Sequence, residues 1–215
     1  MTMEKTFNPK LIIIDCDGVL YHPSELDIDA MVFAFNNVCE ELSLNDKKLI
    51  KGDKNNEPVK GVYNYIEHVA QEAGLDTETF ISKVVAHIDY SHITPDSDNI
   101  LKTLKKLANK CKICICTNNA MQHVNQVIKA KFNISVKQFP FEVFDATYAS
   151  VNGIYYPKQS DIFIKKLEKH FDVKSSDFLW IDDSQQIVDN VAAFGSRYIL
   201  VSDKNRLKDV LESLL

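Results

Sequence analysis

The sequence predicts an α/β protein with a mostly parallel sheet, helices on both faces of the sheet, and a helical insertion after the first strand. Short apolar runs alternate along most of the chain with stretches in which apolar residues recur every three or four positions. This alternation of strand and helix patterns is typical of βαβ units. Residues 23–95 keep the helical spacing but contain no clear strand, which predicts the insertion.

The predicted strands are short, and several are apolar without alternation, as expected of strands buried on both faces. They cover residues 11–14, 111–116, 142–145, 178–181 and 197–201, of which 142–145 is the weakest. The helices predicted between them cover residues 100–107, 121–132, 161–171 and 185–194. The last of these ends before Gly195, which suits a left-handed helix stop. Helical crossovers between parallel strands imply a Rossmann-like three-layer α/β/α core.

The insertion is predicted to contain about four helices. Met31, Phe35 and Val38 illustrate the spacing in its first half, and Ile66 and Val69 illustrate it in the second. A polar stretch at residues 51–57 separates the two halves.

The composition excludes several classes of partner. The chain has 215 residues, a formal net charge of -5 and a pI of about 5.7. Affinity for nucleic acid or for anionic lipid depends on basic surface, so we expect no nucleic-acid polymer and no membrane as a partner. No run approaches the ~18 apolar residues that span a bilayer, and we predict a cytoplasmic protein.

The five cysteines are predicted to be structural. An odd number without a secretion signal argues against a disulfide framework. Cys111, Cys114 and Cys116 could suggest a zinc site, but they lie in a predicted buried strand. No second ligand pair follows at zinc-finger spacing, so we expect core cysteines.

Polar residues lie at the carboxyl ends of the predicted strands or just beyond them. These are Asp15-Cys-Asp17-Gly18, Thr117-Asn118, Lys158 and Asp182-Asp183. Ligands bind at this edge of open α/β sheets, so the four segments are expected to converge on one crevice.

The residue types in that crevice indicate phosphoryl transfer. The Asp15 carboxylate could form an aspartyl-phosphate, and Asp17, two residues further on, could protonate the leaving group and then activate water. Clustered carboxylates repel one another unless a cation lies among them, which predicts Mg²⁺. Thr117 and Lys158 could bind the phosphate oxygens, and Gly18 allows a tight turn after the strand.

The four segments resemble the four motifs of the haloacid dehalogenase superfamily, in the family's order. Residues 11–21 are similar to the first motif, 115–118 to the second, 157–163 to the third and 180–184 to the fourth. The insertion falls where the family carries a helical cap. The resemblance therefore implies a catalytic core of residues 1–22 and 96–215, with residues 23–95 as an inserted cap.

The resemblance also implies a role for each residue. Asp15 would be nucleophile and metal ligand, and Asp17 would be the acid/base with its backbone carbonyl on Mg²⁺. Asp183 would be a further metal ligand, with Asp182 supporting the metal directly or through water. The residues expected to hold phosphate are Thr117, Asn118 and Lys158. One departure is Ile187, which stands where some relatives carry another acid.

Within the superfamily, residues 17–21, 117–120 and 182–184 look most like pyrimidine 5'-nucleotidases of the helical-cap type. We therefore expect a phosphatase acting on a small phosphorylated metabolite, with a nucleoside 5'-monophosphate preferred. Alternatives on the same fold are a phosphoglucomutase-like transfer and a haloacid dehalogenase, although a departing halide needs no proton from Asp17. A non-enzymatic module that binds phosphate, as receiver domains do, ranks below these.

Other polar and aromatic residues are predicted to be structural. Asp96-Ser-Asp98 repeats the Asp-x-Asp pattern, but it precedes a helical pattern and is interpreted as a helix cap. The six histidines form no metal-ligand pattern, and none is expected to be functional. Tyr21 and the aromatic residues of the insertion are expected to lie mostly in the core.

Overall fold

A five-stranded parallel sheet forms the centre of the protein in the computed structural model, which describes residues 8–26, 28–49 and 62–215. The strand order is β3-β2-β1-β6-β7. Their bounds are β1 Leu11–Ile14, β2 Lys112–Cys116, β3 Glu142–Phe144, β6 Phe178–Asp182 and β7 Arg197–Leu200. Every predicted strand is confirmed. Because β1 pairs with both β2 and β6, the carboxyl ends of these three strands lie side by side.

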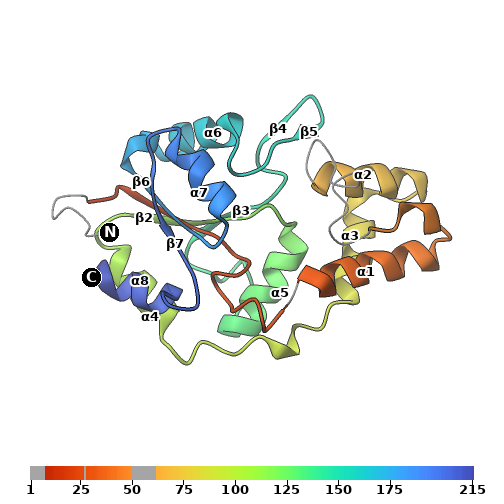
Figure 1. The fold of residues 1–215 in the computed structure, drawn as a ribbon, viewed down its shortest axis with the longest axis horizontal. Coiled ribbons are helices and arrows are strands. Elements are labelled where there is room, and N and C mark those ends of the chain that lie inside the picture. The colour runs from red at the N-terminus through yellow and green to blue at the C-terminus, as the bar shows by residue number, and fades with distance from the viewer. Residues whose placement is uncertain (1–7, 27, 50–61) are drawn as a thin grey trace.

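Helices cover both faces of the sheet, which confirms the three-layer prediction. Ile12 and Ile14 of β1 pack in one core cluster, whereas Leu11 and Ile13 pack in another on the opposite face. The first face is covered by α4 (Ile100–Leu107), α5 (Met121–Phe132) and α8 (Leu207–Ser213), and the second by α6 (Asp161–Phe171) and α7 (Gln185–Ala192). Figure 1 shows the two helical layers on either side of the strands.

The insertion forms a separate helical unit with its own small core, seen at the right of Figure 1. Its helices are α1 (Ile28–Glu41), α2 (Val62–Glu72) and α3 (Thr77–Ala86), with 3-10 turns at Asn45–Lys47 and Tyr90–His92. About four helices were predicted, and these three α-helices are those of the described residues. The polar stretch at 51–57 lies outside the described residues, and the domain boundaries at 22/23 and 95/96 stay a prediction.

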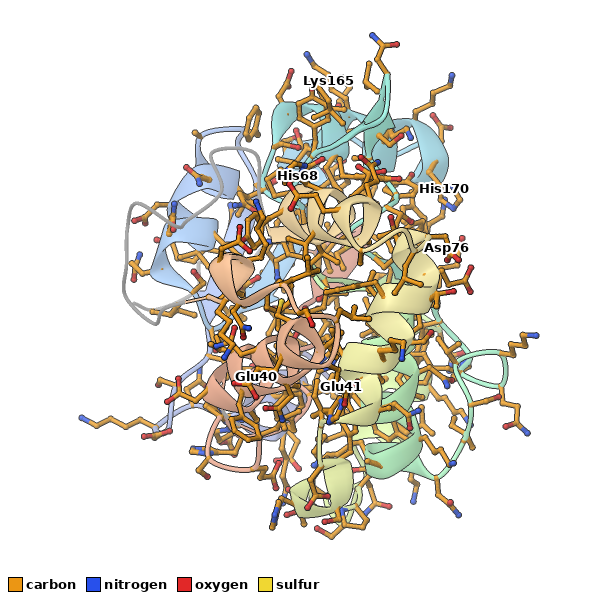
Figure 2. All side chains as sticks on the ribbon, turned by 90° about the vertical axis from the view of Figure 1, so that its right-hand side faces the viewer. Glu40, Glu41, His68, Asp76, Lys165 and His170 are labelled. Carbon is orange, nitrogen blue, oxygen red and sulfur yellow. The ribbon has the colours of Figure 1, made fainter. Side chains whose placement is uncertain are left out.

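The cap contacts the core through polar and apolar groups. The Asn64 side chain of α2 donates to the Tyr155 carbonyl at 2.9 Å and accepts from the Tyr155 N–H at 3.0 Å. Ile81 and Val85 of α3 pack with Ala120 at the start of α5. Viewed from the cap end, Glu40, Glu41 and Asp76 lie on the outward side of the cap (Figure 2).

Tyr155 belongs to a hairpin that the sequence analysis missed. β4 (Ser150–Val151) pairs antiparallel with β5 (Ile154–Tyr155). Asn152 and Gly153 connect them with φ of 51° and 76°. An Asn-Gly pair is a strong sequence signal for such a turn, so this element could have been predicted.

The cysteine prediction is confirmed for β2. Cys114 and Cys116 are buried with their Sγ atoms 3.8 Å apart, and they pack in the core beneath α6. In the described part of the chain, no helix combines the length and the apolar character that crossing a membrane requires.

Candidate active site

Asp15 lies where β1 ends, at the centre of the sheet edge. Its N–H extends the ladder by donating to the Ile181 carbonyl at 2.9 Å. Its Oδ1 accepts from the Cys16 N–H at 2.7 Å and lies 2.6 Å from Nζ of Lys158. The pKa of the Asp15 carboxyl is well above its usual value: burial raises it, Lys158 lowers it, and Asp182 raises it again. More positive charge at this position would therefore be favourable.

Lys158 is the buried cation of the site, with 2% of its surface exposed. Its Nζ also lies 2.8 Å from Oδ2 of Asp182, so one ammonium joins two carboxylates from adjacent strands. Burial lowers the pKa of Lys158, but the two carboxylates raise it more, and the ammonium stays charged. The Lys158 N–H donates to Oδ1 of Asn118 at 2.8 Å, which ties the loop after β2 to the loop before α6.

Asp183 completes a group of three carboxylates. Oxygen atoms of Asp15, Asp182 and Asp183 lie within 4.8 Å of one another, and Asp183 is the exposed member. Such a set of hard oxygen donors, open on one side, fits Mg²⁺ with remaining positions for water or substrate. A cation bound by these three carboxylates would also offset the burial of Asp15 and its repulsion by Asp182.

Gly18 makes room for Asp183. Its φ is +71°, and a Cβ atom at this position would lie 1.9 Å from Oδ2 of Asp183. Only glycine combines this backbone conformation with this close approach.

We therefore expect Gly18→Ala to weaken Mg²⁺ binding about 10-fold or more, because the methyl group displaces the Asp183 carboxylate. Isothermal titration calorimetry with Mg²⁺ measures the dissociation constant of each variant. Gly195→Ala is the matched control, since Gly195 has φ of +79° with nothing within 4 Å of a Cβ. Equal Mg²⁺ affinity in the two variants would contradict the expectation.

Four hydrogen-bonding groups surround the Asp17 carboxylate. Oδ1 accepts from the Tyr21 hydroxyl at 2.6 Å and lies 2.7 Å from Nε2 of His123. Oδ2 accepts from the Asn119 amide at 2.7 Å and from the Thr117 hydroxyl at 3.3 Å. Burial raises the pKa of the Asp17 carboxyl, but His123 and the other donors outweigh burial and hold that pKa below its usual range. Asp17 is therefore a fixed, ionised carboxylate in this arrangement.

The loop that carries Asp17 is also held from the C-terminal part of the chain. The Arg206 guanidinium donates to the carbonyls of Gly18 at 3.3 Å and Tyr21 at 3.2 Å. His22 lies 2.8 Å from Asp203. These contacts constrain the turn that places Asp17 next to Asp15.

The structure thus brings the predicted residues to one edge of the sheet. Thr117 follows β2, and its hydroxyl contacts Asp17 and accepts from the Asn119 N–H at 3.0 Å. Asn118 is exposed, and its side chain contacts Lys158 and Gln159. Phosphate binding by Asn118 stays a prediction, as does the role of the Asp17 carbonyl as a metal ligand.

Four residues in or beside the site were missed by the sequence analysis. Tyr21, Asn119 and His123 contact the Asp17 carboxylate, and the Tyr90 hydroxyl lies 2.8 Å from Nδ1 of His123. The sequence carries a signal for His123. It lies four residues before Val127, which places it on the buried face of α5, at the end of that helix nearest to Thr117. The expectation that no histidine contributes to the site is wrong for His123, which contacts Asp17 directly. Tyr21 is buried as expected, but its hydroxyl is part of the site.

Comparison with known proteins identifies a family for this chain. The sequence model of the family described as haloacid dehalogenase-like hydrolase matches residues 9–189. The comparison with curated proteins gave no match.

Several solved structures share the fold. An enzyme of the haloacid dehalogenase family from Bacteroides thetaiotaomicron, in complex with magnesium and inorganic phosphate, has a TM-score of 0.56 and 16% identity, covering 90% of this chain and 94% of that chain. A mutant of CbbY from Rhodobacter sphaeroides, in complex with xylulose-(1,5)bisphosphate, has a TM-score of 0.58 and 14% identity, covering 93% and 90%. A predicted haloacid dehalogenase-like hydrolase from Porphyromonas gingivalis has a TM-score of 0.61 and 14% identity, covering 96% and 98%.

The identities to these structures are low, so they show the fold alone. The family match covers most of the chain and includes every predicted motif. On this ground, the chain belongs to the haloacid dehalogenase-like hydrolases.

Proposed function

We propose that this protein is a magnesium-dependent phosphomonoester hydrolase that forms an aspartyl-phosphate on Asp15. The observation that carries the proposal is the contact between Asp15 Oδ1 and Lys158 Nζ at 2.6 Å, with Asp182 and Asp183 beside them. A carboxylate nucleophile needs a neighbouring cation both to hold its orientation and to attract a phosphate dianion.

Asp15 is proposed as the nucleophile. The Cys16 N–H and Lys158 both contact its Oδ1, which fixes the carboxylate plane. Oδ2 takes neither of these contacts, and it is the oxygen that attacks phosphorus. The new bond joins Oδ2 to phosphorus, and the bond from phosphorus to the ester oxygen breaks.

Asp17 is proposed as the acid/base. As the ester oxygen leaves, it takes a proton from Asp17. Water then attacks the phosphorus of the aspartyl-phosphate and gives a proton back to Asp17, which releases inorganic phosphate and restores Asp15. The arriving phosphate dianion raises the pKa of Asp17, which favours the protonated form needed in the first step.

Asp15, Asp183 and the Asp17 carbonyl are proposed to hold Mg²⁺, with Asp182 supporting it directly or through water. When bound there, Mg²⁺ would neutralise charge on the phosphate oxygens. The choice of magnesium as the ion is supported by the Bacteroides thetaiotaomicron enzyme of shared fold, which is in complex with magnesium and inorganic phosphate. Thr117, Asn118 and Lys158 are proposed to bind the phosphate oxygens.

The substrate is proposed to be a small phosphorylated metabolite, with pyrimidine nucleoside 5'-monophosphates as the preferred class. The support is the similarity of residues 17–21, 117–120 and 182–184 to helical-cap pyrimidine nucleotidases. A phosphorylated ligand also occupies CbbY, whose fold is shared.

Phosphate release from a panel of monoesters tests the proposal. The panel contains UMP, CMP, purine nucleotides and sugar phosphates, each with Mg²⁺ and with EDTA. We expect release that depends on Mg²⁺, with kcat/KM highest for UMP or CMP. No release from any ester would contradict the hydrolase assignment, and a preference for sugar phosphates would contradict only the substrate class.

A further inference from the structure

A buried histidine, His123, lies between Asp17 and the cap linker, which is the segment that joins cap helix α3 to core helix α4. His123 lies in the first turn of α5 with 3% of its surface exposed. Its Nε2 is 2.7 Å from Oδ1 of Asp17, and its Nδ1 is 2.8 Å from the Tyr90 hydroxyl. Both ring nitrogens therefore have a partner, as a buried imidazole requires.

The three residues come from separate segments. Asp17 is in the loop after β1, His123 is on a core helix, and Tyr90 is in the 3-10 turn between cap helix α3 and core helix α4. The chain of contacts thus runs from the catalytic loop through the core to one of the two connections that join the cap to the core.

The direction of the hydrogen bonds follows from Asp17. An ionised carboxylate has no proton to donate, so the N–H must be on Nε2 of His123. The other ring nitrogen, Nδ1, lies 2.8 Å from the Tyr90 hydroxyl. The Tyr90 and His123 rings also pack together, with centroids 5.5 Å apart, which limits rotation of the imidazole.

The contact matters because Asp17 must point at the ester oxygen. Tyr21 and His123 hold Oδ1, while Asn119 and Thr117 hold Oδ2. Without the His123 contact, Oδ1 of Asp17 keeps only the hydrogen bond from the Tyr21 hydroxyl. The carboxylate is then free to rotate toward Tyr21.

We propose that His123 is a positioning residue for the acid/base Asp17, and that Tyr90 fixes the His123 ring in the orientation that this requires. The inference rests on the proposed hydrolase function. It adds two residues outside the four sequence motifs, and it makes the orientation of Asp17 depend on the connection between cap and core.

Leaving-group dependence tests the role of His123. Expulsion of an alkoxide needs a proton from Asp17, whereas expulsion of p-nitrophenolate needs little help, and kcat/KM reports this step. We expect His123→Leu, which keeps the volume but removes the donor, to lower kcat/KM for glycerol phosphate by about 10- to 100-fold. For p-nitrophenyl phosphate we expect a loss of a few-fold at most.

Three further variants control the interpretation. His123→Gln retains an amide N–H and should recover part of the activity on glycerol phosphate. Tyr90→Phe keeps the ring packing, and it should also lower kcat/KM more for glycerol phosphate than for p-nitrophenyl phosphate, but by a smaller factor than His123→Leu. Asp17→Asn sets the limit, with a loss of about 100-fold or more on glycerol phosphate.

Each outcome has a defined meaning. An equal loss on both esters, or no loss, in His123→Leu would overturn the positioning role while Asp17→Asn still discriminates between them. Failure of Asp17→Asn to discriminate would reject the acid role of Asp17 and, with it, the inference. If His123→Leu does not fold, Tyr90→Phe and His123→Gln provide the test. If neither variant loses more kcat/KM on glycerol phosphate than on p-nitrophenyl phosphate, the proposal is overturned.

Discussion

Asp15→Asn is expected to lower Mg²⁺-dependent phosphate release by at least about four orders of magnitude. The amide oxygen is a poor nucleophile, and no aspartyl-phosphate can form. Burial already raises the pKa of Asp15, so a neutral side chain of the same shape is tolerated there. We therefore expect the variant to unfold at nearly the wild-type urea concentration, which separates loss of chemistry from loss of fold.

Asp96→Asn is the matched control for that substitution. Asp96 also begins an Asp-x-Asp pattern, but its carboxylate accepts from the N–H groups of Ile100 and Leu101 at the start of α4, as the sequence analysis predicted. Asparagine caps helices well, so activity and stability should both be retained. Phosphate release by Asp15→Asn at the rate of Asp96→Asn would refute the nucleophile assignment.

Lys158→Met is expected to cost about 3 kcal/mol of folding stability and at least about 100-fold in kcat/KM. Lys158 contacts Asp15 at 2.6 Å and Asp182 at 2.8 Å, and all three side chains are buried. Removing the ammonium leaves two carboxylates facing each other without a cation. Urea unfolding at pH 7 in EDTA gives the stability difference, and steady-state kinetics gives the change in activity.

The control is an exposed lysine with a similar contact. Lys165 lies 2.7 Å from Asp161 on the surface of α6, where water screens the pair. Lys165→Met should change stability by less than about 0.5 kcal/mol and leave activity unaltered. Equal destabilisation by the two substitutions would show that the buried cluster does not depend on its lysine.

The strands and their polar ends could be predicted because the signals are local. Leu11–Ile14 is a continuous apolar run that stops at an aspartate, and Phe178–Asp182 repeats the same pattern. Parallel pairing places such ends at one edge of the sheet, so the sequence predicts that Asp15 and Asp182 lie close together. The hairpin at residues 150–155 also has a local signal, because Asn152-Gly153 is a typical two-residue hairpin turn, so this element too is predictable from the sequence.

The surroundings of Asp17 could not be predicted in this way. Tyr21 is only 4 positions from Asp17, but His123 is 106 positions away in the sequence. The place of His123 on the buried face of α5 could be inferred from its spacing to Val127. Its partners Asp17 and Tyr90, however, depend on how α5 and the cap linker pack against the loop after β1. No local pattern encodes that packing.

By itself, the sequence determined the α/β class, the order of the strands along the chain, and the set of acids, lysine and threonine at their ends. Those features follow from backbone periodicity and from the short-range chemistry of each segment. Only the tertiary structure decided that Lys158 lies between the carboxylates of Asp15 and Asp182, and which donors hold Asp17. The physical reason is that burial and hydrogen-bond geometry arise when distant segments pack together, and both set the charge and direction of a side chain.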